Sequence, residues 1–342
     1  MKRMKEAKMT HSAKDSGQTR REFARKLAIA GAGLPLAGSM MPAGATMPAG
    51  ATASSPNKNA RIATEPWTIN LFSKHLQFLG YDEMAEACIA SGLDGVDLSV
   101  RPGGHVLPEN VERDLPRAAK AIKQAGLGLP LMTTGITDPD DPATEKILQV
   151  ASELGIRYYR MGYYRYDNKL GVEKSLELIK EKMSKLALLN EKYGLHGAYQ
   201  NHAGNRFGGP VWDIWYVVRD LDPRWTGCQY DIRHAIVEGA QSWTLGFELL
   251  KEHIRYIVIK DFEWSNQSEK WRIINVPVGT GMVDFEAFFQ KLKANQFTGP
   301  ISLHIEYPLF PDENMAVAEK TAAAIKTIRQ EVQSTRALLP KS

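Results

Sequence analysis

The stretch from Gly227 to His234, GCQYDIRH, predicts a short buried β-strand that ends on the carboxylate of Asp231. An imidazole, that of His234, follows a little further along the chain. A carboxylate and a histidine just beyond the end of a strand are what a metal centre or a proton-transfer site needs. The same Asp could instead cap the next helix, with the His packing beside it. The functional interpretation is favoured because other strands of this chain end in the same way.

Apolar runs of strand length alternate with helix-like segments from residue 67 onward. The strands are expected at residues 67–72, 93–100, 127–133, 156–161, 195–201, 227–231, 255–261 and 300–306. The helices are expected at residues 81–91, 110–125, 142–154, 171–193, 211–221, 242–252, 284–294 and 314–332. This alternation is typical of parallel βαβ units, and eight such strands suit a single α/β (β/α)8 TIM barrel. A doubly wound open sheet is the competing architecture, but no Gly-x-Gly-x-x-Gly follows the first strand.

The amino-terminal region predicts a targeting segment rather than part of the fold. The pair Arg20-Arg21 precedes a moderately apolar, Gly- and Ala-rich stretch at 27–41, and small residues follow at 51–53. This pattern resembles a twin-arginine export signal, with a disordered basic tail as the alternative. We therefore expect a signal at residues 1–53, a flexible linker at 54–66, a barrel at 67–335 and a periplasmic location. The Gly and Pro residues in the apolar stretch argue against stable membrane insertion.

Composition limits the class of protein. Hydrophobic residues make up 43% of the 342 residues and charged residues 24%, as in an ordinary globular protein with a sizeable core. The formal net charge of +4 owes much to the basic amino-terminal segment, and the domain has no basic run with interleaved aromatics. We therefore expect no nucleic-acid partner. The two cysteines, Cys88 and Cys228, are too few for a disulfide framework and are expected to be buried apolar residues.

Polar and ionisable residues gather at the carboxyl ends of the expected strands, which meet at one mouth in a barrel. They are Asp97, Arg101, Arg160, Tyr163, Tyr164, Gln200, Asn201, His202, Asp231, His234, Lys260, Asp261, His304 and Glu306. Any one of them could be a helix cap, a salt-bridge partner or a solvated rim residue. Taken together they favour a functional site, because the amino-terminal ends of the strands carry no comparable cluster.

These residues resemble the xylose isomerase-like TIM-barrel family, part of the sugar phosphate isomerase/epimerase superfamily. The matching pieces are YQNH at 199–202, DIRH at 231–234, IKD at 259–261, VGTG at 278–281 with VDF at 283–285, and HIE at 304–306. Each piece alone is a weak motif. Their order and spacing together are fairly specific to the family. The resemblance covers most of the chain from residue 67 to about residue 308, and it implies the barrel fold.

The resemblance also implies a divalent metal, Mn, Mg or similar. Asp231 and Glu306 fall on two of the family's usual ligand positions, and Gln200 stands where a Glu is usual. The family's strand-seven histidine would fall at Val258, which cannot be a ligand. The expected ligand set of Gln200, Asp231 and Glu306 contains only oxygen donors, which favours Mg, Mn or Ca over Zn. His202 or His234 could add a nitrogen ligand, and a metal-free site is the alternative.

The implied activity is that of a sugar isomerase or epimerase, which removes the proton alpha to a carbonyl group, most simply with metal assistance. The catalytic residues expected from the resemblance are Glu306 as base, His234 contacting substrate hydroxyls, Lys260 neutralising an oxyanion, and His202 as acid or base. Further substrate contacts are expected from Arg101, Tyr163, Tyr230 and Trp264.

The expected partner is a small carbohydrate. A phosphate site would need several arginines or a Gly-rich turn that opens a helix, and the family pattern makes Gly279-Thr280-Gly281 a structural turn. An unphosphorylated sugar or keto-sugar is therefore the expected substrate. Two alternatives stay open: a 3-keto-glycoside lyase that uses the same site, and a sugar-binding barrel without catalysis. The oligomeric state also stays open, including a homo-oligomer.

Overall fold

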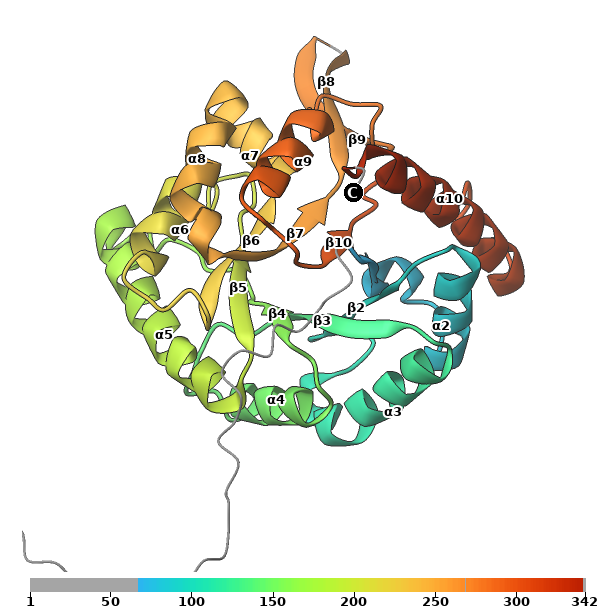
Figure 1. Cartoon of the computed structure of the whole chain (residues 1–342), viewed down its shortest axis with the longest axis horizontal. Coiled ribbons are helices and arrows are strands. Elements are labelled where there is room, and N and C mark those ends of the chain that lie inside the picture. Colours follow the sequence, from blue (N-terminus) through green and yellow to red (C-terminus); the bar gives the residue numbers. More distant parts are fainter. Residues whose placement is uncertain (1–66, 268, 341–342) are drawn as a thin grey trace, which may run out of the picture. The chain divides into compact units, whose positions relative to one another are not determined.

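The chain forms a closed barrel of parallel strands surrounded by helices (Figure 1). The computed structural model describes residues 67–267 and 269–340, so the predicted export signal and linker lie outside the described residues. The strand order around the barrel is β1-β10-β7-β6-β5-β4-β3-β2. Every neighbouring pair in this ring is parallel. The TIM-barrel prediction is confirmed, and the open doubly wound sheet is excluded.

The barrel strands are short, and each is largely buried. They are β1 (Ile69–Phe72), β2 (Gly95–Val100), β3 (Gly128–Thr134), β4 (Tyr158–Arg160), β5 (His196–Gln200), β6 (Thr226–Asp231), β7 (Ile254–Ile259) and β10 (Ile301–Leu303). All of them overlap the strands expected from sequence. The agreement follows from their composition, because buried parallel strands read as continuous apolar runs bounded by turn residues.

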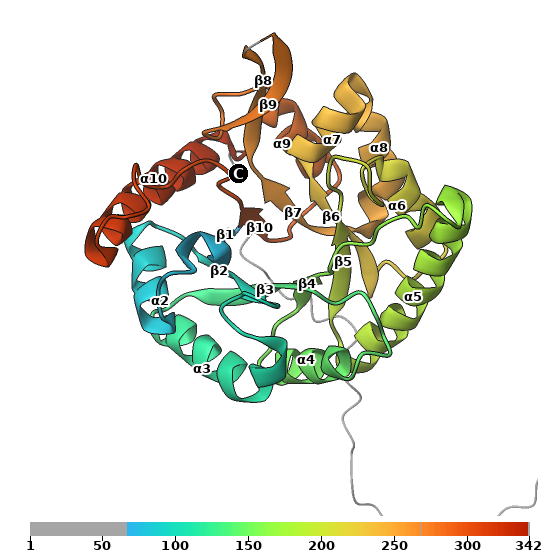
Figure 2. The same ribbon diagram turned by 180° about the vertical axis from the view of Figure 1, so that it is seen from behind.

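Helices cover the outside of the barrel, as the view from behind shows (Figure 2). They are α2 (Tyr81–Ala90), α3 (Val111–Gln124), α4 (Pro142–Glu153), α5 (Gly171–Tyr193), α6 (Val211–Val218), α7 (Ile232–Gly239), α8 (Trp243–Leu250), α9 (Phe285–Ala294) and α10 (Val317–Leu338). Short 3-10 turns are η1 (Ser73–Leu76), η2 (Pro108–Asn110), η3 (Ala240–Ser242) and η4 (Lys251–His253). No helix among the described residues combines the length and hydrophobicity needed to cross a membrane.

Local signals set the helix ends. Asp284 caps α9, because its Oδ1 accepts a hydrogen bond of 2.9 Å from the backbone N–H of Ala287. Gly194 ends α5 in the left-handed region, with φ of 67°, where a residue without a Cβ is favoured. Asp231 caps α7 through His234 N at 3.1 Å. The capping role considered for Asp231 is therefore real, and it uses only one of the two carboxylate oxygens.

The structure corrects the sequence prediction between residues 232 and 276. A short helix, α7, follows β6 directly, where no helix was expected. A hairpin of β8 (Asp261–Gln267) and β9 (Lys270–Val276) then extends beyond the barrel wall (Figure 1). The hairpin was not predicted because no residue of β9 is fully buried and β9 lacks the apolar pattern of a barrel strand.

Strand alternation places polar side chains inside the barrel near its mouth. Ile257 and Ile259 pack in the large cluster between strands and helices, whereas Tyr256 packs with Leu131 and Ala198 in a separate small cluster. Because successive side chains point to opposite faces, Lys260 lies on the same face of the chain as Tyr256. The small cluster of Tyr256, Leu131 and Ala198 therefore fills the interior of the barrel. Polar side chains such as Lys260 lie above it, closer to the carboxyl ends of the strands.

Candidate active site

A cavity of about 320 Å³ lies at the carboxyl ends of the strands. The residues that line it are Phe72, Lys74, Arg101, Arg160, Tyr163, Gln200, His202, Arg233, His234, Lys260, Asn275, His304 and Glu306. The structure therefore brings together most of the side chains singled out from sequence, although they come from widely separated segments. Asp231 lies directly beneath, in contact with Gln200 and Lys260.

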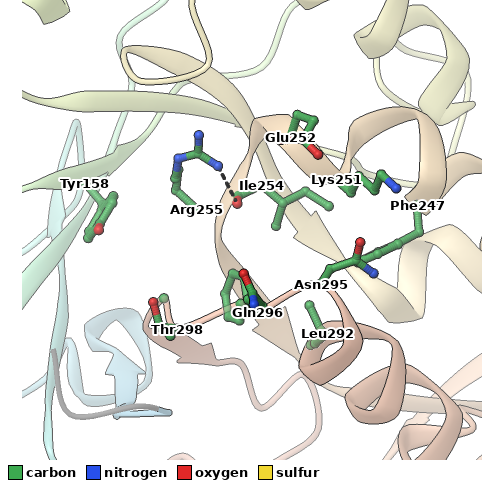
Figure 3. Close-up of a pocket in the computed structure, with 12 residues that line it drawn as sticks. Tyr158, Phe247, Lys251, Glu252, Ile254, Arg255, Leu292, Asn295, Gln296 and Thr298 are labelled. Carbon is green, nitrogen blue, oxygen red and sulfur yellow. Dashed lines mark hydrogen bonds between the residues drawn. The ribbon is translucent and has the colours of Figure 1, made fainter. Parts of the chain in front are cut away.

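A second cavity, of about 300 Å³, lies near the amino ends of β4 and β7 (Figure 3). Tyr158, Lys251, Glu252, Arg255 and Gln296 are among its lining residues, and Arg255 donates a hydrogen bond to the carbonyl of Ile254. Chemistry in TIM barrels takes place at the opposite, carboxyl end of the strands. Its lining also contains no histidine. We therefore assign the candidate active site to the mouth cavity.

The carboxylate of Asp231 is fully buried and fully hydrogen-bonded by the protein. Its Oδ2 accepts from Gln200 Nε2 at 2.8 Å and lies 3.1 Å from Lys260 Nζ. The other oxygen accepts from the backbone of His234. A buried charge of this kind is stable only when paired and hydrogen-bonded, and these contacts meet that requirement.

The hydrogen bonds of His234 indicate the protonation state of Lys260. The guanidinium of Arg233 lies 2.9 Å from His234 Nδ1, and a guanidinium can only donate, so Nδ1 accepts. In a neutral ring the hydrogen is then on Nε2, which lies 2.8 Å from Lys260 Nζ. Only one of Nε2 and Nζ can donate in this contact, so the arrangement favours loss of a proton from Lys260. Lys260 then keeps a hydrogen to donate to Asp231.

Burial lowers the proton affinity of both Lys260 and His234. Burial lowers the pKa of Lys260 below its ordinary value, although the fields of Asp231 and Glu306 act in the opposite direction. Burial and the nearby cations also lower the pKa of His234 well below its ordinary value, which keeps the ring neutral. Lys260 is thus a buried lysine whose proton affinity is reduced.

Glu306 is ionised and paired with Lys74. Lys74 Nζ lies 3.2 Å from Oε1 and 3.0 Å from Oε2 of Glu306. Burial would raise the pKa of Glu306, but the fields of Lys260 and Lys74 outweigh it and lower the pKa to about 2. A carboxylate with such a low proton affinity, and with a cation on both oxygens, is a weak base.

Gln200 links the two sides of the site. Its Oε1 accepts from Tyr163 Oη at 2.6 Å and from Arg160 at 3.2 Å, while its Nε2 donates to Asp231. Both ends of the amide are therefore occupied. His202 stacks on His234 with ring centroids 3.9 Å apart, and its Nδ1 lies 2.9 Å from the carbonyl of Ala203. Because that carbonyl can only accept, Nδ1 carries the hydrogen and Nε2 is left as a base.

The predicted metal ligands Gln200, Asp231 and Glu306 do not fit a divalent ion. The amide oxygen of Gln200 faces two donors, Asp231 contacts Lys260, and both oxygens of Glu306 face Lys74. Across residues 67–267 and 269–340, no group of three or more His, Cys, Asp or Glu side chains could hold a metal ion. The resemblance implied a metal ion beside Asp231. The structure places the amine of Lys260 there.

Two predicted substrate contacts are corrected by the structure. Tyr230 is fully buried behind the barrel wall, where its hydroxyl donates to the carbonyl of Trp243 and its ring stacks on Phe288. It precedes Asp231 by one residue, so it points to the opposite face of the strand. Trp264 does not line the mouth cavity, because β8 carries it outward and leaves it 42% exposed. Arg101 and Tyr163 do line the cavity.

Several residues of the mouth were missed from sequence. Lys74 follows β1 in η1, and Arg233 lies inside the DIRH motif; both positions could have been suspected because they follow strand ends. Asn275 comes from β9, where it accepts a hydrogen bond of 2.7 Å from Arg233 and donates one of 3.1 Å to the Glu306 carbonyl. No signal in the sequence indicates that contact, since the hairpin itself was not predicted.

Comparisons with known proteins place the chain in a family. The fold and the polar mouth define an α/β barrel with an active-site-like cavity at the carboxyl ends of its strands. Residues 85–330 match the family model described as xylose isomerase-like TIM barrel, and the chain belongs to that family. No curated protein sequence shows significant similarity to it.

Solved structures share the fold at low sequence identity. The chain is similar to a structure of L-ribulose 3-epimerase, with 17% identity, coverage of 80% of this chain and 94% of that chain, and a TM-score of 0.59. It is similar to D-allulose 3-epimerase from Methylomonas sp., with 14% identity, coverage of 81% and 99%, and a TM-score of 0.58. A xylose isomerase-like TIM barrel protein from Mycobacterium smegmatis in complex with magnesium shares 11% identity over 80% and 98%, with a TM-score of 0.59.

Proposed function

We propose that this protein is a sugar isomerase or epimerase that removes the proton from a carbon next to a carbonyl group. Membership of the xylose isomerase-like family and the likeness to two ketose 3-epimerase structures support this class of reaction. The observation that carries the proposal is the buried Lys260, which faces the cavity between Asp231 and His234 and whose pKa is lowered by burial.

Lys260 is the base in this proposal. Its amine takes the proton from the substrate carbon; the C–H electron pair forms a carbon–carbon double bond, and the carbonyl electrons move to oxygen. The resulting ammonium lies beside the negative enediolate and beside Asp231. A base with a lowered pKa close to the working pH suits such a step. Glu306 was expected to be the base, but its pairing with Lys74 makes it better suited to holding that cation in place.

His202 is the second acid–base group. Its Nε2 is free to accept a proton and lies on the cavity wall. Proton return to the neighbouring carbon gives an isomer, and return to the opposite face of the same carbon gives an epimer. Neither outcome requires a metal ion, because the ammonium formed on Lys260 balances the enediolate charge.

The test is hydrogen exchange with solvent. Wild-type protein is incubated in D2O with D-allulose, D-fructose, L-ribulose and the keto-uronate D-fructuronate, and deuterium at the alpha carbon and new products are followed by NMR. We expect exchange or conversion with at least one sugar. Absence of both with every sugar would overturn the proposal.

Two substitutions of Lys260 test whether this residue accepts the substrate proton or only contributes a positive charge. Lys260→Met and Lys260→Arg should both lower turnover by about a thousandfold, since neither side chain can accept the proton at neutral pH. If Lys260 only stabilised a negative oxygen, Lys260→Arg would retain most of the activity. Lys251→Met, in the second cavity, is the matched control and should behave as wild type.

A further inference from the structure

The mouth cavity carries more positive charge than its own acidic groups balance. Besides Lys260, four cationic side chains line it, and the only carboxylate among the lining residues belongs to Glu306, which Lys74 already neutralises. Asp231 beneath the cavity contacts Lys260. After these pairs are removed, three guanidinium groups are left, those of Arg101, Arg160 and Arg233.

None of these three guanidinium groups is hydrogen-bonded to a carboxylate in the described part of the chain. Arg160 is only 4% exposed and donates to neutral acceptors, the Tyr163 hydroxyl at 2.7 Å and the Gln200 amide at 3.2 Å. Arg233 likewise faces neutral His234 and Asn275. The guanidinium of Arg101 lies over the Phe72 ring, 5.3 Å from its centroid.

Arginines elsewhere in the protein behave differently. Arg336 contacts Asp94 at 2.7 Å, and Arg113 contacts Asp114 at 2.8 Å, both near the surface. The mouth arginines are more buried and lack such partners. In the described part of the chain, the Nε atoms of Arg101, Arg160 and Arg233 are buried without a hydrogen-bond partner. Burying a charge without a hydrogen-bonded counter-ion is unfavourable, so an anion should bind here.

Asp97, a buried carboxyl group near these arginines, makes its side-chain hydrogen bonds within the described residues to hydroxyl groups and not to a guanidinium. Asp97 accepts from Thr133 at 2.9 Å on one oxygen and from Ser302 at 2.6 Å on the other. Burial raises the pKa of Asp97 to about 6 in spite of those hydrogen bonds and of the fields of Arg160 and Arg101, so at neutral pH its charge offsets part of theirs. Burial, and after it the repulsion from Arg160, lower the pKa of Arg101.

We propose that the substrate is a sugar acid whose carboxylate binds between Arg101 and Arg160. A carboxylate is planar and matches the fork of a guanidinium, so one carboxylate can satisfy both groups. Arg101 follows β2 and Arg160 ends β4, which flank β3. In the barrel order β3 lies opposite β7, and Lys260 follows β7. The carboxylate end of the substrate would thus lie across the mouth from the base.

A carboxylate fits better than a phosphate. Phosphate sites usually use backbone N–H groups of a Gly-rich turn. The one Gly-rich turn considered from sequence is already used, because the N–H groups of Gly279 and Gly281 both donate to Oδ2 of Asp261, at 3.0 and 2.9 Å. The inference rests on the proposed function for the reacting end of the sugar, and it extends the expected substrate from a neutral sugar to an acidic one.

The test compares matched ligands by isothermal titration calorimetry at low ionic strength. The probes are D-fructuronate, D-fructose and D-fructose 6-phosphate. We expect wild type to bind D-fructuronate at least tenfold more tightly than D-fructose. Equal affinities for these two, or tighter binding of D-fructose 6-phosphate than of D-fructuronate, would overturn the proposal.

Arginine variants locate the carboxylate. Arg101→Met makes the cleaner variant, because Arg101 Nε has no hydrogen-bond partner among the described residues, and Arg160→Met is the second. Each should remove most of the preference for D-fructuronate over D-fructose, with folding checked by circular dichroism. Arg255→Met, in the second cavity, should keep the full preference. A preference that survives in both Arg101→Met and Arg160→Met would refute the assignment.

The two proposals fail in different ways. Tight D-fructuronate binding without hydrogen exchange in D2O would support the carboxylate site and contradict the proposed isomerase or epimerase. Hydrogen exchange with equal use of D-fructose and D-fructuronate would support the reaction and contradict the carboxylate site.

Discussion

The amine of Lys260 lies 3.1 Å from Oδ2 of Asp231, and both side chains are buried beneath the mouth of the barrel. The family resemblance had implied a metal ion bound to this carboxylate. The contact replaces a metal–carboxylate interaction with one between an amine and a carboxylate. The positive charge that the reaction needs is then created by the proton transfer itself.

The first prediction concerns the pH dependence of activity. Lys260 must be uncharged to act as base, so kcat/KM should rise with pH through the pKa of Lys260, which burial places below the ordinary value of 10.5. The field of Asp231 raises that pKa, so Asp231→Asn should move the rising limb to lower pH. The pH profile of kcat/KM for the two proteins gives the answer. A limb that moves to higher pH in Asp231→Asn would contradict the assigned base.

The second prediction concerns metal removal. Because Lys260 and Lys74 face the oxygens that a metal would use, dialysis against EDTA should change activity by less than about twofold. Activity and metal content by mass spectrometry are measured on the same sample before and after dialysis. Loss of activity on dialysis, with recovery on adding Mn or Mg, would show that the mouth rearranges to bind a metal.

The third prediction concerns stability in acid. Burial lowers the pKa of His196 to about 3. The unfolded chain takes up a proton at His196 below about pH 6.5, whereas the folded protein does not, so stability falls as pH drops from 6.5 towards 3. Between pH 6.5 and pH 5 this amounts to about 2 kcal/mol. His196→Gln should lose that part of the pH dependence.

Urea unfolding at pH 7 and pH 5 measures this effect. The His196→Gln variant should be less stable than wild type at pH 7, because the contact of Nδ1 with the Arg224 carbonyl is altered. Its unfolding free energy should nevertheless fall less between the two pH values. His196 lies at the start of β5, away from the mouth, so kinetic constants should stay unchanged. An unchanged pH slope would mean that His196 is charged in the folded protein.

The fourth prediction tests the correction at Tyr230. Tyr230→Phe removes the hydroxyl that donates to the Trp243 carbonyl at 3.1 Å. We expect a loss of about 1 kcal/mol in unfolding free energy, the usual value of one buried hydrogen bond, with KM and kcat unchanged. Thermal unfolding and steady-state kinetics are the measurements. A raised KM in this variant would show that Tyr230 takes part in substrate binding, as the sequence predicted.

The barrel could be predicted from sequence because its strands are buried on both faces. Runs such as Ile254–Ile259 are apolar throughout, and capping residues such as Asp284 indicate where helices begin. The hairpin could not be predicted in the same way, since no residue of β9 is fully buried and its pairing with β8 rests on backbone hydrogen bonds, which leave no apolar pattern in the sequence.

The identity of the mouth residues could be predicted, but their contacts could not. Strand ends point to Gln200, Asp231, Lys260 and Glu306, and these do converge. The pairing of Glu306 with Lys74 joins residues 232 positions apart, and nothing in the local sequence specifies it. The metal stays a prediction for that reason: a ligand set inferred from residue types does not show which oxygens are already hydrogen-bonded.

The β8–β9 hairpin gives this barrel a part that can change independently. Within residues 67–267 and 269–340 its strands pair only with each other, yet Asn275 touches both Arg233 and the backbone of Glu306. Substitutions along the hairpin can therefore alter the rim of the cavity without disturbing the hydrogen-bonded ring of strands. Barrels of this family that differ mainly in this segment would keep the same ring of strands and differ at the rim of the cavity.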